Sequence, residues 1–161
     1  MDNELTSGKK HGLDKTLEAL RQVAVETNKE WSAIFGIPQS TAITCVKPSG
    51  TVSQLVDSSS GIHPRHSSYY IRTVRGDNKD PLTNFMKDSG IPSEADFMKP
   101  DTQTVFSFPM KSPKKSVVRN DMTAIEQLEM WLLYQRHWCE HKPSVTVSVR
   151  DEEWMEVGAF V

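Results

Sequence analysis

Short runs of β-branched and aromatic residues, bounded by proline, glycine or serine, alternate along this chain with longer segments of helical periodicity. The short runs occupy residues 41–46, 69–75, 104–108 and 145–149, and the helical segments occupy residues 14–35, 81–89, 123–138 and those from 151 onward. β-branched and aromatic residues favour strands. Alternation of strands and helices is typical of a parallel sheet covered by helices. The sequence therefore predicts an α/β fold.

The ends of the predicted helices carry clear signals. Apolar residues at helical spacing fill residues 14–35, and Gly36 and Pro38 follow at the point where the helix should end. Thr123 and Glu126 form the pattern of a capping box, in which each side chain accepts a hydrogen bond from the other residue's backbone N–H. A further helix should start there, and Pro109 should end the strand before it.

The two ends of the chain differ from its middle. Residues 1–12 are polar and glycine-containing, and we expect a loose lead-in there. The last helical segment begins near Asp151 and presents Trp154, Val157 and Phe160 without an obvious apolar partner in the sequence. We therefore expect residues 13–161 to form an incomplete domain, a piece of a larger α/β assembly.

Composition excludes several classes of protein. Hydrophobic residues make up 37% of the 161 residues and the formal net charge is −2, which favours neither disorder nor direct binding to nucleic acid. No apolar run reaches the roughly 18–20 residues that span a membrane. Cys45 and Cys139 are too few for a disulfide framework, and we expect buried structural thiols in a cytoplasmic protein.

The strongest candidate site is the loop after the predicted strand at residues 41–46. Its residues are Lys47, Pro48, Ser49, Gly50, Thr51, Val52 and Ser53. Gly50 allows a ligand to approach the backbone closely, and the N–H groups of a following helical turn favour an anion. Hydroxyl groups add donors, so phosphate is the expected ligand. The alternative is that Ser49 and Thr51 only cap a short helix.

Several separate stretches together resemble the late barrel region of the adenosylcobalamin-dependent ribonucleotide reductases. They are residues 41–55, Ser59–Arg65, Tyr69–Arg72, Arg119–Met122 and Gln135–Thr146, and they occur in the family's order. The monomeric ribonucleoside-triphosphate reductase is the nearest type. The resemblance covers nearly everything from about residue 14 to residue 161, and it implies a partial segment of a ten-stranded α/β barrel.

The resemblance also implies roles for particular residues. In the family the Pro-Ser-Gly-Thr loop binds the phosphates of the ribonucleotide substrate, a role that falls here on Pro48, Ser49, Gly50, Thr51, Val52 and Ser53. The turn containing Ser60, Gly61, Ile62 and His63 corresponds to a region near the substrate. The family further implies adenosylcobalamin as cofactor and a thioredoxin-type reductant.

The residues of the family's radical chemistry are missing from this sequence. The thiyl cysteine sits in an Asn-x-Cys-x-Glu pattern, which does not occur here, and neither Cys45 nor Cys139 matches a catalytic position. We therefore expect no catalytic residue in this chain and no activity from the chain alone. It is a fragment, an inactive remnant, or a complementation subunit that docks onto a separate chain carrying the rest of the reductase.

Other clusters have simpler interpretations. His137 and His141 are four residues apart, a spacing that brings two ligands to one metal, yet the resemblance assigns no metal here and a histidine near a helix C-terminus is favourable in itself. Lys111, Lys114 and Lys115 lie in a basic stretch without an aromatic platform for nucleic acid, which indicates a solvated loop.

Overall fold

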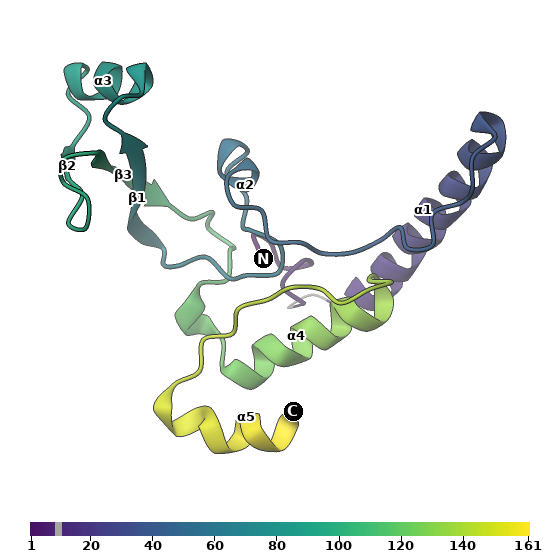
Figure 1. Ribbon diagram of the computed structural model, residues 1–161. Coiled ribbons are helices and arrows are strands. Elements are labelled where there is room, and N and C mark those ends of the chain that lie inside the picture. The colour runs from purple at the N-terminus through teal and green to yellow at the C-terminus, as the bar shows by residue number, and fades with distance from the viewer. Residues whose placement is uncertain (9–10) are drawn as a thin grey trace. The chain divides into compact units, whose positions relative to one another are not determined.

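The computed structural model describes residues 1–8 and 11–161, and these form two compact units. Unit 1 consists of Met1–His66 and Pro113–Val161, so its two parts are far apart in sequence; unit 2 is the intervening stretch Ser67–Ser112. Both are drawn in Figure 1, where the element labels used below are given. Each unit has its own secondary structure and its own buried residues, and each is described by itself.

Unit 1 is mainly helical. Its elements are α1 (Leu13–Phe35), the single turn α2 (Val52–Leu55), the 3₁₀ turns η1 (Arg119–Asp121) and η2 (Asp151–Glu153), α4 (Ala124–His137) and α5 (Trp154–Phe160). Helix α1 contacts α4, and α4 contacts α5. The predicted helices at residues 14–35, 123–138 and after Asp151 are therefore confirmed, as is the capping box: Thr123 and Glu126 exchange hydrogen bonds of 3.2 and 2.7 Å.

The core of unit 1 gathers apolar side chains from four places in the sequence. Its buried members are Met1, Leu13, Leu17, Ile62, Met130 and Tyr134. Only the first turns of α1 contribute to it, because Leu20, Trp31 and Ile34 are 54%, 47% and 62% exposed. Most of the apolar surface that the sequence assigns to α1 thus lies open along the helix.

The beginning of the chain is packed rather than loose. Met1 is 5% exposed and lies in the core, and the Tyr134 hydroxyl donates a hydrogen bond of 3.1 Å to the carbonyl of Thr6. The expectation of a loose lead-in was wrong for residues 1–8, because polar composition does not show that a few apolar side chains are buried. Residues 9–10 of that lead-in lie outside the described residues.

Two predicted strands of unit 1 are extended segments without a strand partner in the described part of the chain. They are residues 41–46 and 145–149. In the second, Val145, Val147 and Val149 are half-buried while the residues between them are exposed, the alternation of a strand covered on one face. The strand assignment of both segments was wrong, although their composition correctly indicated extended chain.

Unit 2 is a sheet with one helix. The strands β1 (Tyr69–Asp77), β2 (Ser93–Ala95) and β3 (Gln103–Lys111) lie in the order β1-β3-β2, and α3 (Pro81–Asp88) follows β1. Both strand pairs are antiparallel, with Tyr69 opposite Lys111 at one end and Asp77 opposite Gln103 at the other. The prediction of a parallel sheet was therefore wrong for the described strands.

Packing inside unit 2 depends on close contact between α3 and the sheet. A side chain added at Gly76 would collide with Thr83 of α3 and lie 3.3 Å from the ring of Phe106, which is 1% exposed. Pro109 does not end β3 as predicted. On one edge of β3, Pro109 lies opposite Ile71 of β1; on the other edge, β2 pairs only with residues 104–106, so Pro109 has no neighbouring strand there. The missing N–H therefore costs no sheet hydrogen bond.

Across the described helices, we find none that combines the length and the apolar character needed to cross a bilayer.

Candidate functional site

The predicted phosphate loop is held by a pair of serines. The backbone N–H of Ser49 donates to the Ser60 hydroxyl at 2.9 Å, and the same hydroxyl donates to the Ser49 carbonyl at 2.9 Å. The Ser49 hydroxyl in turn accepts from the N–H of Ser53 at 3.2 Å, four residues on. Ser49 is thus fixed from both sides, and its own side chain closes the loop over residues 50–52.

The enclosed residues face outward. Gly50, Thr51 and Val52 are exposed, and within the described part of the chain no hydrogen bond occupies their backbone N–H groups. An added side chain at Gly50 would meet nothing within 4 Å, so the space above this residue is open. Three successive N–H groups are therefore available to a ligand that accepts hydrogen bonds.

The predicted substrate-proximal turn, residues 60–63, packs against this loop and holds it through Ser60. Gly61 has a φ of +57°, which a side chain disfavours, and an added Cβ would lie 3.2 Å from Val46. Ile62 is 3% exposed and belongs to the core. His63 Nδ1 lies 2.7 Å from the Ser60 carbonyl, and its Nε2 accepts the N–H of Thr146 at 2.9 Å, which fixes the tautomer. The turn therefore joins the loop to residues 144–149.

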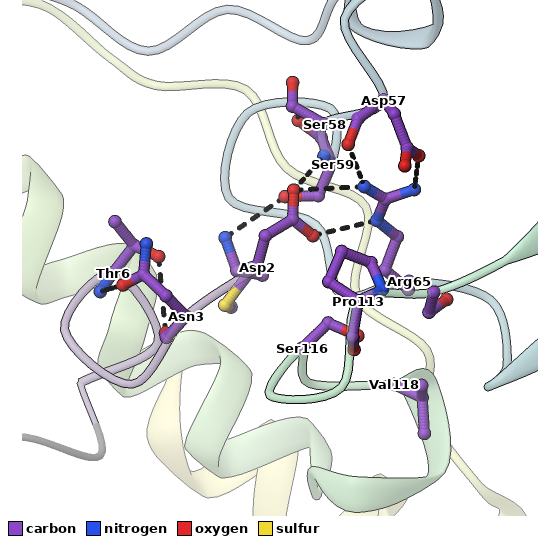
Figure 2. A network of polar contacts seen from close by, with 12 residues as sticks. Asp2, Asn3, Thr6, Asp57, Ser58, Ser59, Arg65, Pro113, Ser116 and Val118 are labelled. Atoms are coloured by element: carbon purple, nitrogen blue, oxygen red, sulfur yellow. Dashed lines mark hydrogen bonds and ion pairs between the residues drawn. The ribbon is translucent and has the colours of Figure 1, made fainter.

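A buried arginine anchors the other end of the turn, as Figure 2 shows. The guanidinium of Arg65 binds both carboxylate oxygens of Asp2, at 2.8 and 3.1 Å, and the carboxylate and carbonyl of Asp57 at 3.1 and 2.6 Å. Asp2 also accepts the N–H of Ser59 at 2.6 Å. Residues 57–59 are thereby tied to the start of the chain, directly before the serine that holds the loop.

Electrostatics in this network favour the charged carboxylate. Burial alone would raise the pKa of Asp2, but the hydrogen bonds from Arg65 and Ser59 outweigh it and hold the pKa below its ordinary value of 3.8. The side chain of Arg65 is 3% exposed and that of Asp2 22% exposed. A guanidinium so deeply buried is favourable only while it keeps its carboxylate partners.

The segment that leads into the loop is held by Glu140, which follows α4. Two adjacent N–H groups, those of Ile43 and Thr44, donate to the carboxylate of Glu140, just beyond the helix. These two hydrogen bonds lower the pKa of Glu140 below its ordinary value of 4.5. The Glu140 N–H donates back to the Thr44 carbonyl at 2.9 Å. The carboxylate therefore replaces part of the strand pairing that this segment lacks.

The predicted site residues thus divide by position. Gly50, Thr51 and Val52 are exposed, while Ser60, Ile62 and His63 hold the scaffold beneath them. Reasoning from the sequence missed the network around Arg65, because its partner Asp2 is 63 residues away. The family-like stretch Ser59–Arg65 was the only signal that included Arg65, and it gave no partner.

The remaining candidates from the sequence are two histidines and two cysteines. His137 Nδ1 lies 2.8 Å from the carboxylate of Glu18 on α1, and His141 is exposed. No cluster of three or more histidine, cysteine or carboxylate side chains suited to a metal occurs within residues 1–8 and 11–161. Cys139 is buried as predicted, whereas Cys45 is half-buried.

Comparison with known proteins shows which reductases the chain is similar to. No family model matches the chain. Among curated proteins it is 32% identical to an adenosylcobalamin-dependent ribonucleoside-triphosphate reductase of Lactobacillus gasseri, over 91% of the chain and 20% of that protein. The protein of the same name from Euglena gracilis is 30% identical over 88% of the chain and 20% of its own length. The chain is homologous to one segment of these reductases. It spans about a fifth of the length of the curated relatives that it matches.

A solved structure supports the same relationship. The crystal structure of a B12-dependent, class II ribonucleotide reductase matches with a TM-score of 0.76 and 27% identity, over 91% of this chain and 21% of the other. The predicted fold class, a partial segment of the α/β barrel of a ribonucleotide reductase, is confirmed by this match. Such a segment explains why strand-like residues in unit 1 lack strand partners among residues 1–8 and 11–161.

Proposed function

We propose that this chain supplies the substrate phosphate-binding loop of a cobalamin-dependent reductase that converts ribonucleoside triphosphates to deoxyribonucleoside triphosphates. The binding residues are Pro48, Ser49, Gly50, Thr51, Val52 and Ser53, with the turn at Ser60, Gly61, Ile62 and His63 beneath them. The observation that carries the proposal is the set of three adjacent, exposed and unbonded N–H groups at residues 50–52.

Phosphate suits these groups because its oxygens accept several hydrogen bonds at once. The loop offers backbone N–H groups in succession, the hydroxyl of Thr51, and the ammonium group of Lys47 nearby in sequence. The double hydrogen bond between Ser49 and Ser60 fixes the loop before a ligand arrives, so little ordering entropy is lost on binding. The simpler role of Ser49 as a cap for α2 is compatible with this one, since one hydroxyl closes the loop and the N–H groups face outward.

The chemical step belongs to other parts of the reductase. This sequence has no Asn-x-Cys-x-Glu pattern, so we propose that the chain alone is inactive and acts with a companion chain or segment. Adenosylcobalamin supplies the radical that starts the family's reaction, and a thioredoxin-type dithiol supplies the electrons. In this proposal the role of this chain is to hold the triphosphate. We propose the cytoplasm as its compartment, since both cysteines are free thiols.

Hydrogen exchange tests the loop directly. A ribonucleoside triphosphate, and inorganic triphosphate as a second probe, should slow exchange at residues 50–53 of the wild-type chain. The double variant Gly50→Val with Thr51→Val should lose that protection and keep its fold, because a side chain at residue 50 meets nothing within 4 Å.

A matched control separates binding from folding. The double variant Gly158→Val with Thr73→Val makes the same two substitutions at exposed positions outside the loop, and Gly158 is also free of neighbours within 4 Å. It should keep the protection. Equal protection of residues 50–53 in both double variants would contradict the proposed phosphate site.

A further inference from the structure

Cys45 and Cys139 come together where the segment before the phosphate loop runs alongside the end of α4. The Glu140 N–H donates to the Thr44 carbonyl at 2.9 Å, and the indole N–H of Trp138 donates to the Cys45 carbonyl at 3.1 Å. These bonds hold residues 44–45 against residues 138–140. Cys45 and Cys139 are therefore neighbours, although they are far apart in sequence.

The side chain of Cys45 lies on the same side as the residues that follow Cys139. The sulfur of Cys45 lies 3.7 Å from the His141 carbonyl and 3.8 Å from the Lys142 carbonyl, so it points toward the chain that follows Cys139. Burial raises the pKa of the Cys139 thiol, and the neighbouring Cys45 thiol raises it further. The two cysteines therefore lie in the same small region of unit 1.

The two thiols differ in access. Cys139 is 4% exposed, while Cys45 is half-buried. An attack on a dissolved disulfide requires a thiolate that the disulfide can reach. Cys45 is therefore the thiol that reacts first, and Cys139 is the thiol that resolves the product.

We propose that Cys45 and Cys139 are a dithiol modification site that forms a reversible intrachain disulfide when a low-molecular-weight disulfide is the oxidant. The Cys45 thiolate attacks one sulfur of the oxidant, which forms a mixed disulfide and releases one thiolate. The Cys139 thiolate then attacks the sulfur of Cys45, which forms the Cys45–Cys139 bond and releases the second thiolate. The two cysteines lose two electrons in all, the oxidant gains them, and the two released thiolates take up the two protons.

The bond joins the segment before the phosphate loop to the residues that follow α4. It covalently reinforces the contact that the Glu140 carboxylate makes with Ile43 and Thr44. The site does not depend on nucleotide binding, because neither cysteine belongs to the Ser49–Ser53 loop. Its test therefore remains valid if the phosphate site fails.

The experiment exposes the reduced chain of 161 residues to oxidised glutathione and follows it by intact mass and by mapping of alkylated peptides. In the wild type we expect the loss of two hydrogens and a peptide that links Cys45 to Cys139. Cys139→Ser should accumulate glutathione on Cys45, because the resolving thiol is gone. Cys45→Ser should react about tenfold more slowly, since burial protects Cys139.

The same oxidation in concentrated urea measures how far the fold brings the thiols together. We expect at least about tenfold more intrachain disulfide in the native chain than in urea at a matched oxidant concentration, because the native contact raises the effective concentration. Equal yields in both conditions would overturn the proposal. So would a wild-type chain that keeps glutathione on Cys45, forms only links between chains, or leaves both thiols open to alkylation.

Discussion

Units 1 and 2 differ in how the backbone N–H and C=O groups of their extended segments find hydrogen-bond partners. In unit 2, β1 pairs with β3 along its whole length from Tyr69 to Asp77, and all partners lie within one stretch of 46 residues, Ser67–Ser112. In unit 1, residues 41–46 and 145–149 have no strand partner in the described part of the chain. They are held instead by side-chain hydrogen bonds, such as those from Glu140 and His63.

The difference shows which parts of the fold this chain encodes by itself. Antiparallel neighbours close in sequence pair without help from distant segments. Strand-like segments of a barrel need neighbours on both sides, and the relatives carry most of their length outside the matched region. Unit 1 therefore has segments with the composition of barrel strands, but those segments have no strand pairing among the described residues.

The largest expected effect is in unit 2. Phe106→Ala removes a ring that is 1% exposed and should lower the free energy of unfolding of the sheet by about 3–5 kcal/mol. Amide exchange of β1 and β3 in increasing urea measures this loss. Phe97→Ala is the control, because Phe97 is 95% exposed and its removal should change stability by no more than about 0.5 kcal/mol.

Tryptophan fluorescence reports on unit 1 separately, since all four tryptophans, Trp31, Trp131, Trp138 and Trp154, lie in that unit. In Phe106→Ala we expect the fluorescence transition to shift less than the amide protection of the sheet. Equal shifts would show that the two units unfold as one, and the contrast between them would then fail.

The next effect concerns the network at the base of the loop. Arg65→Met leaves the carboxylate of Asp2 without its guanidinium and should cost about 3 kcal/mol, at the lower end of values for broken buried ion pairs because Asp2 is partly exposed. Urea denaturation followed by tryptophan fluorescence measures it. Arg136→Met, at an exposed position of α4, is the matched control, and an equal loss there would contradict the anchoring role of Arg65.

A smaller effect depends on pH. The folded-state pKa of Glu140 is lowered, so its stabilising contribution is fully present above about pH 4.5 and is lost as the pH falls through the folded-state pKa. The amide chemical shifts of Ile43 and Thr44 should titrate with a midpoint below 4.5, and Glu140→Gln should abolish that titration. Glu129→Gln, an exposed change on α4, should leave it intact; a midpoint at or above 4.5 would contradict the contact.

Local signals in the sequence were sufficient for the longer helices and for β1 and β3 of unit 2, whereas the short strand β2 (Ser93–Ala95) was not predicted. The capping box at Thr123 and Glu126 and the glycine after Phe35 depend on residues a few positions apart, and the structure confirms both. The direction of strand pairing was not predictable in this way. Composition indicates an extended, half-buried segment, but it does not identify the neighbouring strand.

The candidate site follows the same rule. The loop at Ser49–Ser53 was found because its residues are adjacent in sequence. The contacts that hold it, from Ser60, Arg65 with Asp2, and Thr146 with His63, join residues 11 to 83 positions apart. Whether those residues bind phosphate stays a prediction of the family resemblance.

The most direct test of the proposed function mixes this chain with a companion that carries the rest of a class II reductase. Size-exclusion chromatography with light scattering detects a complex, and the same fractions are assayed for cobalamin-dependent reduction of ribonucleoside triphosphates. We predict no activity from the chain alone, a mixed complex with activity, and a loss of that activity in the Gly50→Val, Thr51→Val variant. Reduction by the chain alone, or full activity of the companion without it, would contradict the proposed role of this chain.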